Sequence, residues 1–540
     1  MSGLTLLLIS VVLFFSGYLF YGRFLTKKFG IDKNQKTPAH TMEDGVDYVP
    51  AKAPVLLGHH FASIAGAAPI IGPVTAAVFG WGPVYLWIIV GGIFMGAVHD
   101  FSALIASVRH KAKSIALVID EQIGTFGKRL FLVFAWSALI LILAAFLVIV
   151  AKTFEAKPEV AAASALFILL ALIFGVSLYR LKLNLVVGTI VGVLLLFLCI
   201  YIGMMFPLKL GLTAWIWILI GYIFAASVAP VWILLQPRDY LNSFLLYILL
   251  IGAFVGILLT NPKIELQFYA GFSKEIGYLF PILFVTVACG AISGFHSLVA
   301  SGTTSKQLNR ETDAKLIGYG GMLIESLLAV IALITAAMLT GDKYRAFMPL
   351  KKTGNPVELF ADGVGGFLAS FGIPLETGIS FAALAVSAFA LTSLDTGCRL
   401  ARLSFQEFFA SKKSGKQDKL LGNRFFATLV SVMAGGGLAL SGQWKAIWPL
   451  FGAANQLLAA LALLAVTIWL RNKKSSNWFV RYPMYFMYIM TNCALFILIW
   501  QNIRRGHYII TFFTVLLLGV SLTMVIHAIK SLRRPRAAAS

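Results

Sequence analysis

Long apolar segments alternate with short polar connections along almost the whole chain. A helix needs about 20 apolar residues to cross a bilayer, and about 15 segments of roughly that length are present. They cover residues 4–22, 56–79, 83–109, 129–151, 160–178, 185–206, 213–235, 242–260, 279–303, 317–340, 376–398, 423–441, 447–470, 482–501 and 508–530. The pattern predicts an all-α polytopic membrane protein.

Composition supports this class. Hydrophobic residues make up 59% of the chain and charged residues 12%, with a mean hydropathy of +0.87, whereas soluble domains carry about 25% charged residues. The four cysteines lie in or beside apolar segments and lack metal-ligand spacing. We therefore expect neither a disulfide nor a metal site.

The basic residues mark topology. The net charge is +22, and most of the 44 Lys and Arg residues fall in the connections after odd-numbered segments. The positive-inside rule places those connections in the cytoplasm, the N-terminus outside and the C-terminus inside. No connection is large enough to present a basic nucleic-acid-binding face, so nucleic acid is not an expected partner.

The segment at residues 56–79 contains an unusual stretch at residues 58–73, with three glycines, two prolines and a histidine pair. Pro69 removes a backbone donor and disfavours helix at the residue before it. Irregular backbone in a membrane must face protein or a water-filled cavity, and broken helices build the substrate site of many transporters. We predict a broken helix with Ser63, Gly66 and Pro69 at such a site. A kinked structural helix is the alternative.

A second stretch of this kind covers residues 288–305, with glycines, hydroxyl residues and a histidine. It runs in the opposite direction to the first, as an inverted repeat requires, although segment 213–235 also meets that requirement. Its expected substrate-site residues are Ser293, Gly294, Phe295 and His296. We expect the two stretches to meet in mid-membrane, with Ser63, Gly66 and Pro69 facing Ser293, Gly294 and His296.

Three acids lie inside apolar segments: Asp100, Glu325 and Asp395. A central charge costs about 2.5–3.5 kcal/mol, so each acid needs a partner, a proton or water. Asp100, beside His99, and Glu325 lie on stripes of small residues, where membrane helices approach closely. We predict that both acids take part in ion or proton coupling. The alternative is a protonated, structural carboxyl group.

Weaker coupling candidates are His59, His60, His99 and Asp395. Asp395 precedes Arg399 and Arg402 at helical spacing, so an ion pair at a helix end is the alternative. No Lys or Arg falls in the middle of a segment, and we read residues 236–239 as a tight turn, with a gate as the other interpretation.

The driving force is expected to be an ion gradient, because no GxxxxGK[ST] motif for ATP occurs. Buried titratable groups favour protons. Sodium remains the alternative, since Ser301, Thr303 and Thr304 offer hard oxygen ligands. An enzyme is not expected: His99 and Asp100 are adjacent and should not face one another on a helix, and no nucleophile–base set is recognisable. We expect no cofactor.

Several stretches together resemble the carbon-starvation protein A (CstA) family of peptide and pyruvate transporters. They are residues 59–69, 96–101, 235–242, 289–304, 391–396 and 448–456. The resemblance implies an inner-membrane carrier of the amino acid/polyamine/organocation superfamily, with a LeuT-like core of two five-helix inverted repeats. It also implies uptake of peptides, or of pyruvate in close relatives, under carbon starvation. This chain looks shorter than the larger members of the family.

From these observations we predict one transmembrane domain. Residues 1–55 form an outer helix and a cytoplasmic loop, 56–400 the transport core, and 401–540 additional helices and a short basic tail. The expected function is proton-driven peptide symport, with a small-molecule substrate and membrane lipid as partners. Symport of pyruvate or another small carboxylate is the first alternative, and a nutrient sensor that does not transport is the second.

Overall fold

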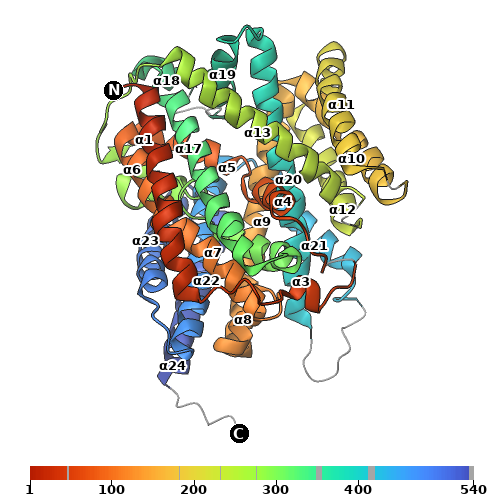
Figure 1. Cartoon of the computed structure of the whole chain (residues 1–540). Coiled ribbons are helices and arrows are strands. Elements are labelled where there is room, and N and C mark those ends of the chain that lie inside the picture. Colours follow the sequence, from red (N-terminus) through yellow and green to blue (C-terminus); the bar gives the residue numbers. More distant parts are fainter. Residues whose placement is uncertain are drawn as a thin grey trace.

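The computed structural model describes residues 1–45, 48–181, 183–230, 233–274, 276–347, 356–410 and 420–533. It is a helical bundle in which α1 begins at one end and α24 finishes at the other (Figure 1). The strands of the described residues form one antiparallel hairpin, β1 (Ser273–Lys274) with β2 (Gly277–Tyr278). The all-helical prediction is confirmed.

The helices follow the apolar segments closely. The first are α1 (Gly3–Ser16), α2 (Gly22–Phe29), α3 (Pro38–Thr41), α4 (Ala53–Ile64), α5 (Ala68–Ala76), α6 (Trp81–Gly91), α7 (Ala97–Arg109), α8 (Ile115–Gln122) and α9 (Thr125–Ala156). Next come α10 (Pro158–Tyr179), α11 (Leu185–Met205), α12 (Leu212–Val228), α13 (Leu235–Thr260), α14 (Phe284–Thr286), α15 (Phe295–Val299), α16 (Ser305–Gln307) and α17 (Gly321–Ala337). The last are α18 (Gly341–Phe347), α19 (Pro356–Ala369), α20 (Leu375–Phe409), α21 (Arg424–Leu440), α22 (Trp444–Asn472), α23 (Trp478–Arg504) and α24 (Tyr508–Arg533). Short 3-10 or π segments are η1 (Gly17–Tyr21), η2 (Ala77–Phe79), η3 (Gly92–Gly96), η4 (Leu279–Leu283), η5 (Ala300–Thr304), η6 (Glu311–Asp313) and η7 (Lys315–Gly320).

Among the described residues, 11 helices are long and apolar enough to cross a membrane, or 12 if a bent pair counts as one span. The expected count of about 15 is not confirmed. Two of the remaining segments form apolar helices just below the required length, α12 and α21. The third, at residues 279–303, is not a continuous helix.

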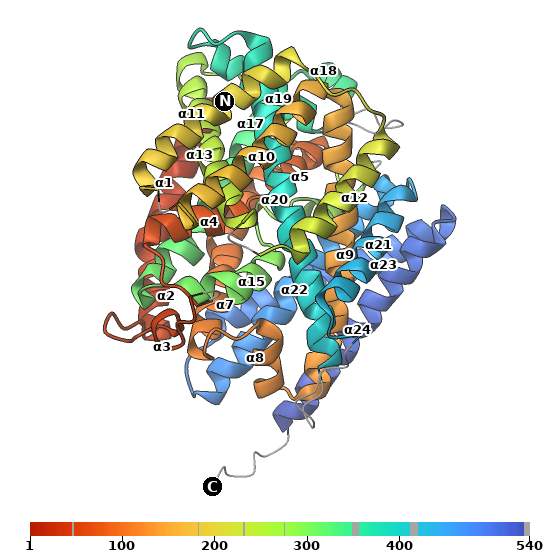
Figure 2. The same cartoon turned by 90° about the vertical axis from the view of Figure 1, so that its right-hand side faces the viewer.

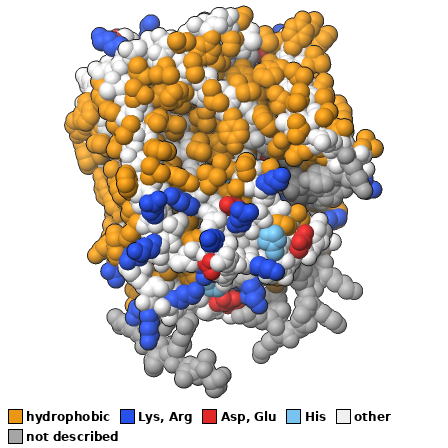
Figure 3. Space-filling view, in the orientation of Figure 1, with side chains coloured by type: hydrophobic (Ala, Val, Ile, Leu, Met, Phe, Trp, Pro, Cys, Tyr) orange, Lys and Arg blue, Asp and Glu red, His pale blue; other side chains and the backbone are white. Residues whose placement is uncertain are grey.

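The surface has the character of a membrane protein. On the face in Figure 3, hydrophobic side chains cover the upper part, and Lys and Arg gather toward the lower end. Large apolar side chains are more than half exposed within long helices, as with Leu194, Ile251 and Phe512. Lipid tails can cover such residues, whereas a water-exposed apolar surface of this extent would be unusual.

The two predicted interruptions are confirmed. The first span consists of α4 and α5 with η2, bent by 48° at the break. Ala65 leaves the helical conformation there, and Pro69 begins the next helix within its first turn, where a proline is tolerated. In the second span, residues 287–294 are not helical and separate α14 from α15.

Two sets of five segments pack with similar contacts. The first set is α4–α5, α6–α7, α9, α12 and α13, and the second is α14–α15 with η5, η7–α17, α20, α21 and α22. Contacts made by one set have counterparts in the other. α4 packs on α13, and in the same way α14 packs on α22; α5 packs on α17, and η5 packs on α7. α9 packs on α21, and α20 packs on α12. The hairpin α10–α11 is inserted in the first set, and α11 lies at the edge of the bundle (Figures 1 and 2).

Candidate functional site

Four buried titratable residues meet where the second interrupted span crosses α7 and α17. We call His99, Asp100, His296 and Glu325 the central cluster. Asp100 shares its oxygens between two imidazoles, with Oδ1 2.7 Å from His99 Nδ1 and Oδ2 2.7 Å from His296 Nδ1. The other ring nitrogen of His296, Nε2, lies 3.3 Å from Glu325 Oε2. All four side chains are fully buried.

Glycine brings these elements together. A Cβ on Gly92 would lie 2.5 Å from Ser326 Oγ, and one on Gly318 would lie 3.0 Å from Phe101 Cα. The first glycine lets the α6–α7 span approach α17 beside Glu325, and the second lets η7 approach α7. The small-residue stripes through Asp100 and Glu325 therefore mark close helix contacts, as the sequence predicted.

A π segment lies within about one turn of each cluster residue. η3 ends just before His99 and Asp100, η5 begins just after His296, and η7 ends just before Glu325. Segments of this kind often occur at functional sites, where they disturb the regular hydrogen-bond ladder. The central cluster is thus held by three helices that each have an irregular turn beside it.

The central cluster consists of side chains that can bind protons. It contains two carboxyl groups and two imidazoles, and no Lys or Arg among the described residues forms an ion pair with it. Both oxygens of Glu325 and Nε2 of His296 lack a hydrogen bond in the part of the chain that the structure describes. Buried charges need compensation, and a proton bound by one of these groups can supply it.

The side chains of His99 and Asp100 contact each other, although we expected them to point apart. Neighbouring helix positions do not normally face one another, yet these two side chains are 2.7 Å apart. The expectation was wrong because Asp100 has two oxygens, and one turns toward its neighbour while the other reaches His296.

The histidine pair of the first interrupted span lies next to this cluster. His60 Nδ1 is 2.8 Å from Thr304 Oγ1, which joins α4 to η5. His59 points elsewhere, with Nδ1 3.8 Å from Asp239 Oδ2. The two histidines therefore contact different parts of the molecule.

A second buried group surrounds Arg238. We call Tyr222, Arg238, Asp239 and Asp395 the arginine cluster. Arg238 Nη1 contacts Asp395 Oδ2 and lies 2.5 Å from the Tyr222 hydroxyl, which is 2.8 Å from the same carboxylate oxygen. Arg238 Nη2 is 3.1 Å from Asp239 Oδ1. Arg238 is only 1% exposed.

The arginine cluster corrects two predictions. Asp395 forms an ion pair, but with Arg238 of α13; the guanidinium groups of Arg399 and Arg402 donate to the carbonyls of Ala229 and Ser227. Residues 236–239 lie in the first turns of α13 and not in a tight turn. A buried arginine thus lies inside a helix in which the sequence suggested no cation, because its partners come from distant segments.

The residues expected at the substrate site are all buried, but the two stretches face different neighbours. Ser63 Oγ donates to the carbonyl of His59, and Pro69 is buried at the start of α5. A Cβ on Gly66 would lie 2.5 Å from Ser393 Oγ of α20. The nearest neighbours of Gly294 are instead in α22, namely Asn455, Leu458 and Ala459. The two glycines do not face one another as expected.

Asn455 of α22 holds the second interruption. Its Oδ1 accepts from Phe295 N at 2.9 Å, its Nδ2 lies 3.0 Å from Ser293 Oγ, and its carbonyl accepts from Gly294 N at 3.0 Å. These bonds satisfy backbone and hydroxyl groups that the broken helix leaves free. The site prediction did not include Asn455, although an amide inside an apolar segment is a recognisable signal.

The hydroxyl residues offered for sodium have protein partners. Ser301 Oγ donates to the carbonyl of Ser297 and accepts from Ile115 N, and Thr303 Oγ1 donates to the carbonyl of Val299. Thr304 contacts His60, as described above. The three hydroxyls therefore have separate local partners.

A family profile and several known proteins match most of this chain. The profile of the family described as "Carbon starvation protein CstA" matches residues 2–355 and 348–494. The "Peptide transporter CstA" of Campylobacter jejuni is 35% identical, over 91% of this chain and 79% of its own length. The protein of the same name from Bacillus subtilis is 33% identical, over 92% of this chain and 90% of its own. The "Pyruvate/proton symporter BtsT" of Escherichia coli is 32% identical, over 92% and 81% respectively.

Proposed function

Since the chain belongs to the carbon starvation protein CstA family, we propose that it is a secondary active transporter that takes up peptides with protons. Relatives named as peptide transporters cover most of the chain, which supports the substrate class. We further propose that it acts in the bacterial inner membrane, that it serves uptake when carbon is scarce, and that it belongs to the amino acid/polyamine/organocation superfamily.

The observation that carries the proton coupling is the central cluster. His296 lies between two carboxyl groups, 2.7 Å from Asp100 and 3.3 Å from Glu325. A proton added to or removed from these groups changes the charge of a buried site, where the low effective dielectric makes electrostatic interactions strong. Intramembrane acids of this kind mark proton paths.

The cluster can transmit this change to the interrupted spans. His296 begins the helix after the second break, and His60 of the first span contacts η5 of the second. A proton that binds more tightly in one arrangement of these spans favours that arrangement. We propose that Ser63, Gly66, Pro69, Ser293, Gly294 and Phe295 line the substrate path that these spans control.

The packing pattern supports a LeuT-like core. The two five-segment sets exchange contacts pairwise, and each set begins with an interrupted span, which is the arrangement of inverted-repeat transporters. We propose that the second repeat begins at η4–α14, and that the hairpin α10–α11 is an insertion in the first. The basic end of the bundle is proposed to face the cytoplasm, with the N-terminus outside.

A second candidate substrate is pyruvate or another small carboxylate. One relative is named as a pyruvate/proton symporter. The buried guanidinium of Arg238 is also a group that binds carboxylates, although here it contacts Asp395 and Asp239. Peptides remain the first candidate, because more of the relatives have that name.

The test is transport by proteoliposomes that contain the purified chain alone. We expect a dipeptide or tripeptide to accumulate when the outside is made acidic, with acidification of the lumen that requires the substrate. Acidification with pyruvate only would select the second candidate. Accumulation that is driven by a sodium gradient and insensitive to pH would identify sodium, and not the proton, as the coupling ion. Binding of substrate without any transport would identify a sensor.

A further inference from the structure

A cavity of about 630 Å³ lies between α22, α23 and α24, far in the sequence from both buried clusters. Its inner wall is apolar and comes from three membrane helices, with Leu464 and Ile468 on α22, Met484 on α23, and Val525 and Ile529 on α24. This volume lies in the range of small-molecule binding sites, about 300–1,000 Å³.

Three cations surround one end of this cavity: Arg471, Lys474 and Arg481. No acidic residue lines it, and among the residues that the structure describes none of the three forms an ion pair. Two tyrosines of α23, Tyr485 and Tyr488, also line the wall. Tyrosine is typical of the depth at which lipid headgroups begin.

Two buried polar atoms are left without a partner beside the cavity. Thr467 is 8% exposed. Neither its Oγ1 nor Nε of Arg481 has a hydrogen bond within the described part of the chain. Buried polar groups are normally hydrogen-bonded. A ligand with acceptor oxygens would satisfy these atoms.

We propose that this cavity binds an anionic phospholipid from the leaflet at the basic end of the bundle. The phosphate would lie among Arg471, Lys474 and Arg481, and an acyl chain would extend along the apolar wall. A lipid fits better than a soluble anion, because the cavity continues from its cationic end between membrane-embedded helices. Basic pockets between helices are a known form of anionic lipid site.

The connection between α22 and α23 holds Lys474 and lies between Arg471 and Arg481, and it is anchored at both ends. Asn472 Nδ2 donates to Gln122 Oε1 at 2.8 Å, and Asn477 Nδ2 donates to the carbonyl of Thr467 at 3.2 Å. These bonds hold the cations in place before a lipid arrives, which lowers the entropy cost of binding.

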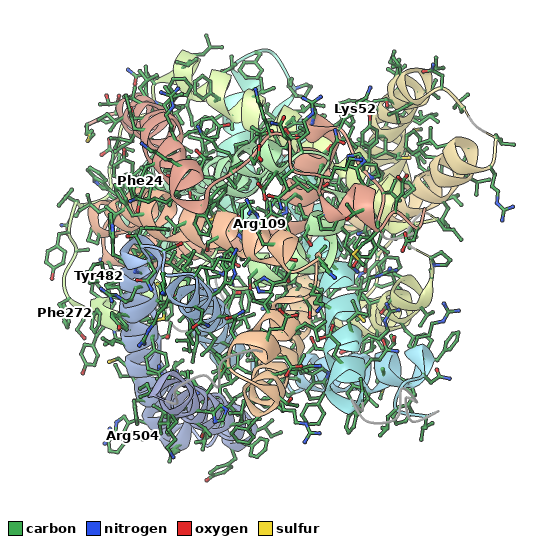
Figure 4. The ribbon with its side chains drawn as sticks, turned by 60° about the horizontal axis from the view of Figure 1, so that its bottom comes forward. Phe24, Lys52, Arg109, Phe272, Tyr482 and Arg504 are labelled. Carbon is green, nitrogen blue, oxygen red and sulfur yellow. The ribbon has the colours of Figure 1, made fainter. Side chains whose placement is uncertain are left out.

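The experiment is native mass spectrometry of the full chain, purified in detergent and given phosphatidylglycerol or phosphatidylcholine. The test variant carries Arg471→Gln, Lys474→Gln and Arg481→Gln. The control carries Lys27→Gln, Lys33→Gln and Lys52→Gln, which remove equal charge from exposed sites. Lys52 lies far from Tyr482, the residue after Arg481 in α23, in Figure 4.

We expect the unmodified chain to retain phosphatidylglycerol at least about tenfold better than phosphatidylcholine. The test variant should lose this preference and the control should keep it, since each cation near the surface contributes on the order of 1 kcal/mol, or about fivefold. Val525→Trp, which fills the cavity and leaves the cations intact, should also lower retention. The three single Gln variants serve if the triple variant does not fold.

Three results would overturn the proposal. The first is equal retention of phosphatidylglycerol by the test and control variants. The second is equal retention of the two lipids by the unmodified chain. The third is displacement of the lipid by glycerol phosphate at millimolar concentration, with equal protection against thermal unfolding, because that would identify a soluble anion as the ligand.

Discussion

The central cluster and the arginine cluster solve the same problem in different ways. Each buries two carboxyl groups inside the bundle. In the arginine cluster a guanidinium, which stays charged, contacts both acids. In the central cluster the groups beside the acids are imidazoles, side chains that can be either neutral or charged. The first group is therefore suited to fixed structure, and the second to a charge that changes during a cycle.

The two clusters also differ in their hydrogen bonding. The Tyr222 hydroxyl and the Arg238 guanidinium converge on one oxygen of Asp395. In the central cluster the one polar contact of the Glu325 side chain with described residues is the 3.3 Å approach of His296. A loosely held acid can exchange a proton with little rearrangement, whereas a tightly held ion pair resists it.

The largest expected effect is the loss of the cation in the arginine cluster. Arg238→Met leaves Asp395 and Asp239 buried without their partner, and breaking a buried pair in this way costs about 3–5 kcal/mol. Thermal unfolding of the purified variant in detergent measures it. The double variant Arg238→Met with Asp395→Leu should recover only part of the loss, because Asp239 stays buried without the guanidinium. If Arg238→Met alone unfolds like the unmodified chain, the pair is not structural.

The next effect is on coupling and not on folding. Asp100→Asn keeps the size and much of the hydrogen bonding of the side chain but cannot titrate. We expect proton-driven accumulation in vesicles to fall by about tenfold or more, equivalent to at least about 1.4 kcal/mol, while exchange of substrate continues. Glu325→Gln should behave in the same way. Uptake with and without a pH gradient, normalised to folded protein, is the measurement.

A full response to the pH gradient in both variants would remove the central cluster from the coupling path. The hydroxyl residues Ser301, Thr303 and Thr304 would then be the next candidates, with sodium as the ion. Loss of exchange together with accumulation would instead indicate damage to the substrate path.

Much of the fold could be predicted because the bilayer imposes a local rule. A run of about 20 apolar residues is readable from sequence alone. Most long helices begin and end near the predicted bounds, but α20 continues to Phe409 past the predicted end at 398, and α13 begins at Leu235 before the predicted start at 242. The breaks at Pro69 and near Gly294 were also readable, since glycine and proline act on their own backbone.

The partners within the site could not be predicted in the same way. Asp395 finds Arg238 across 157 positions and Asp100 finds His296 across 196. Sequence spacing predicts only partners on the same helix, which is why Arg399 and Arg402 were expected beside Asp395. Glu325 and Asp100 were recognised as interior acids, but that they share one histidine depends on how three helices pack.

A smaller effect is expected at the support of the central cluster. Asn455→Ala removes the acceptor for Phe295 N and the partner of Ser293, next to His296. A buried donor left unsatisfied costs about 1–3 kcal/mol, so unfolding should occur at lower temperature. Asn455→Asp, measured at acidic pH so that the new carboxyl group is protonated, keeps the acceptor and should lose less. Equal stability of the Ala and Asp variants would show that the oxygen of Asn455 is not needed.

The smallest effect is expected at His59, which distinguishes the two members of the histidine pair. His59 lies 3.8 Å from Asp239, beyond hydrogen-bond distance, and its side chain is 15% exposed. Its neighbour His60 is fully buried and contacts Thr304 at 2.8 Å. His59→Gln should therefore change stability by less than about 1 kcal/mol, as expected of a weak ion pair, and leave proton-driven uptake intact. His60→Gln should cost more, because it disturbs the contact that joins the two interrupted spans. The measurement is thermal unfolding and gradient-driven uptake of both variants side by side. If His59→Gln has the larger effect, the link to Asp239 in the arginine cluster, and not the link to Thr304 beside the central cluster, is the one that the transport cycle uses.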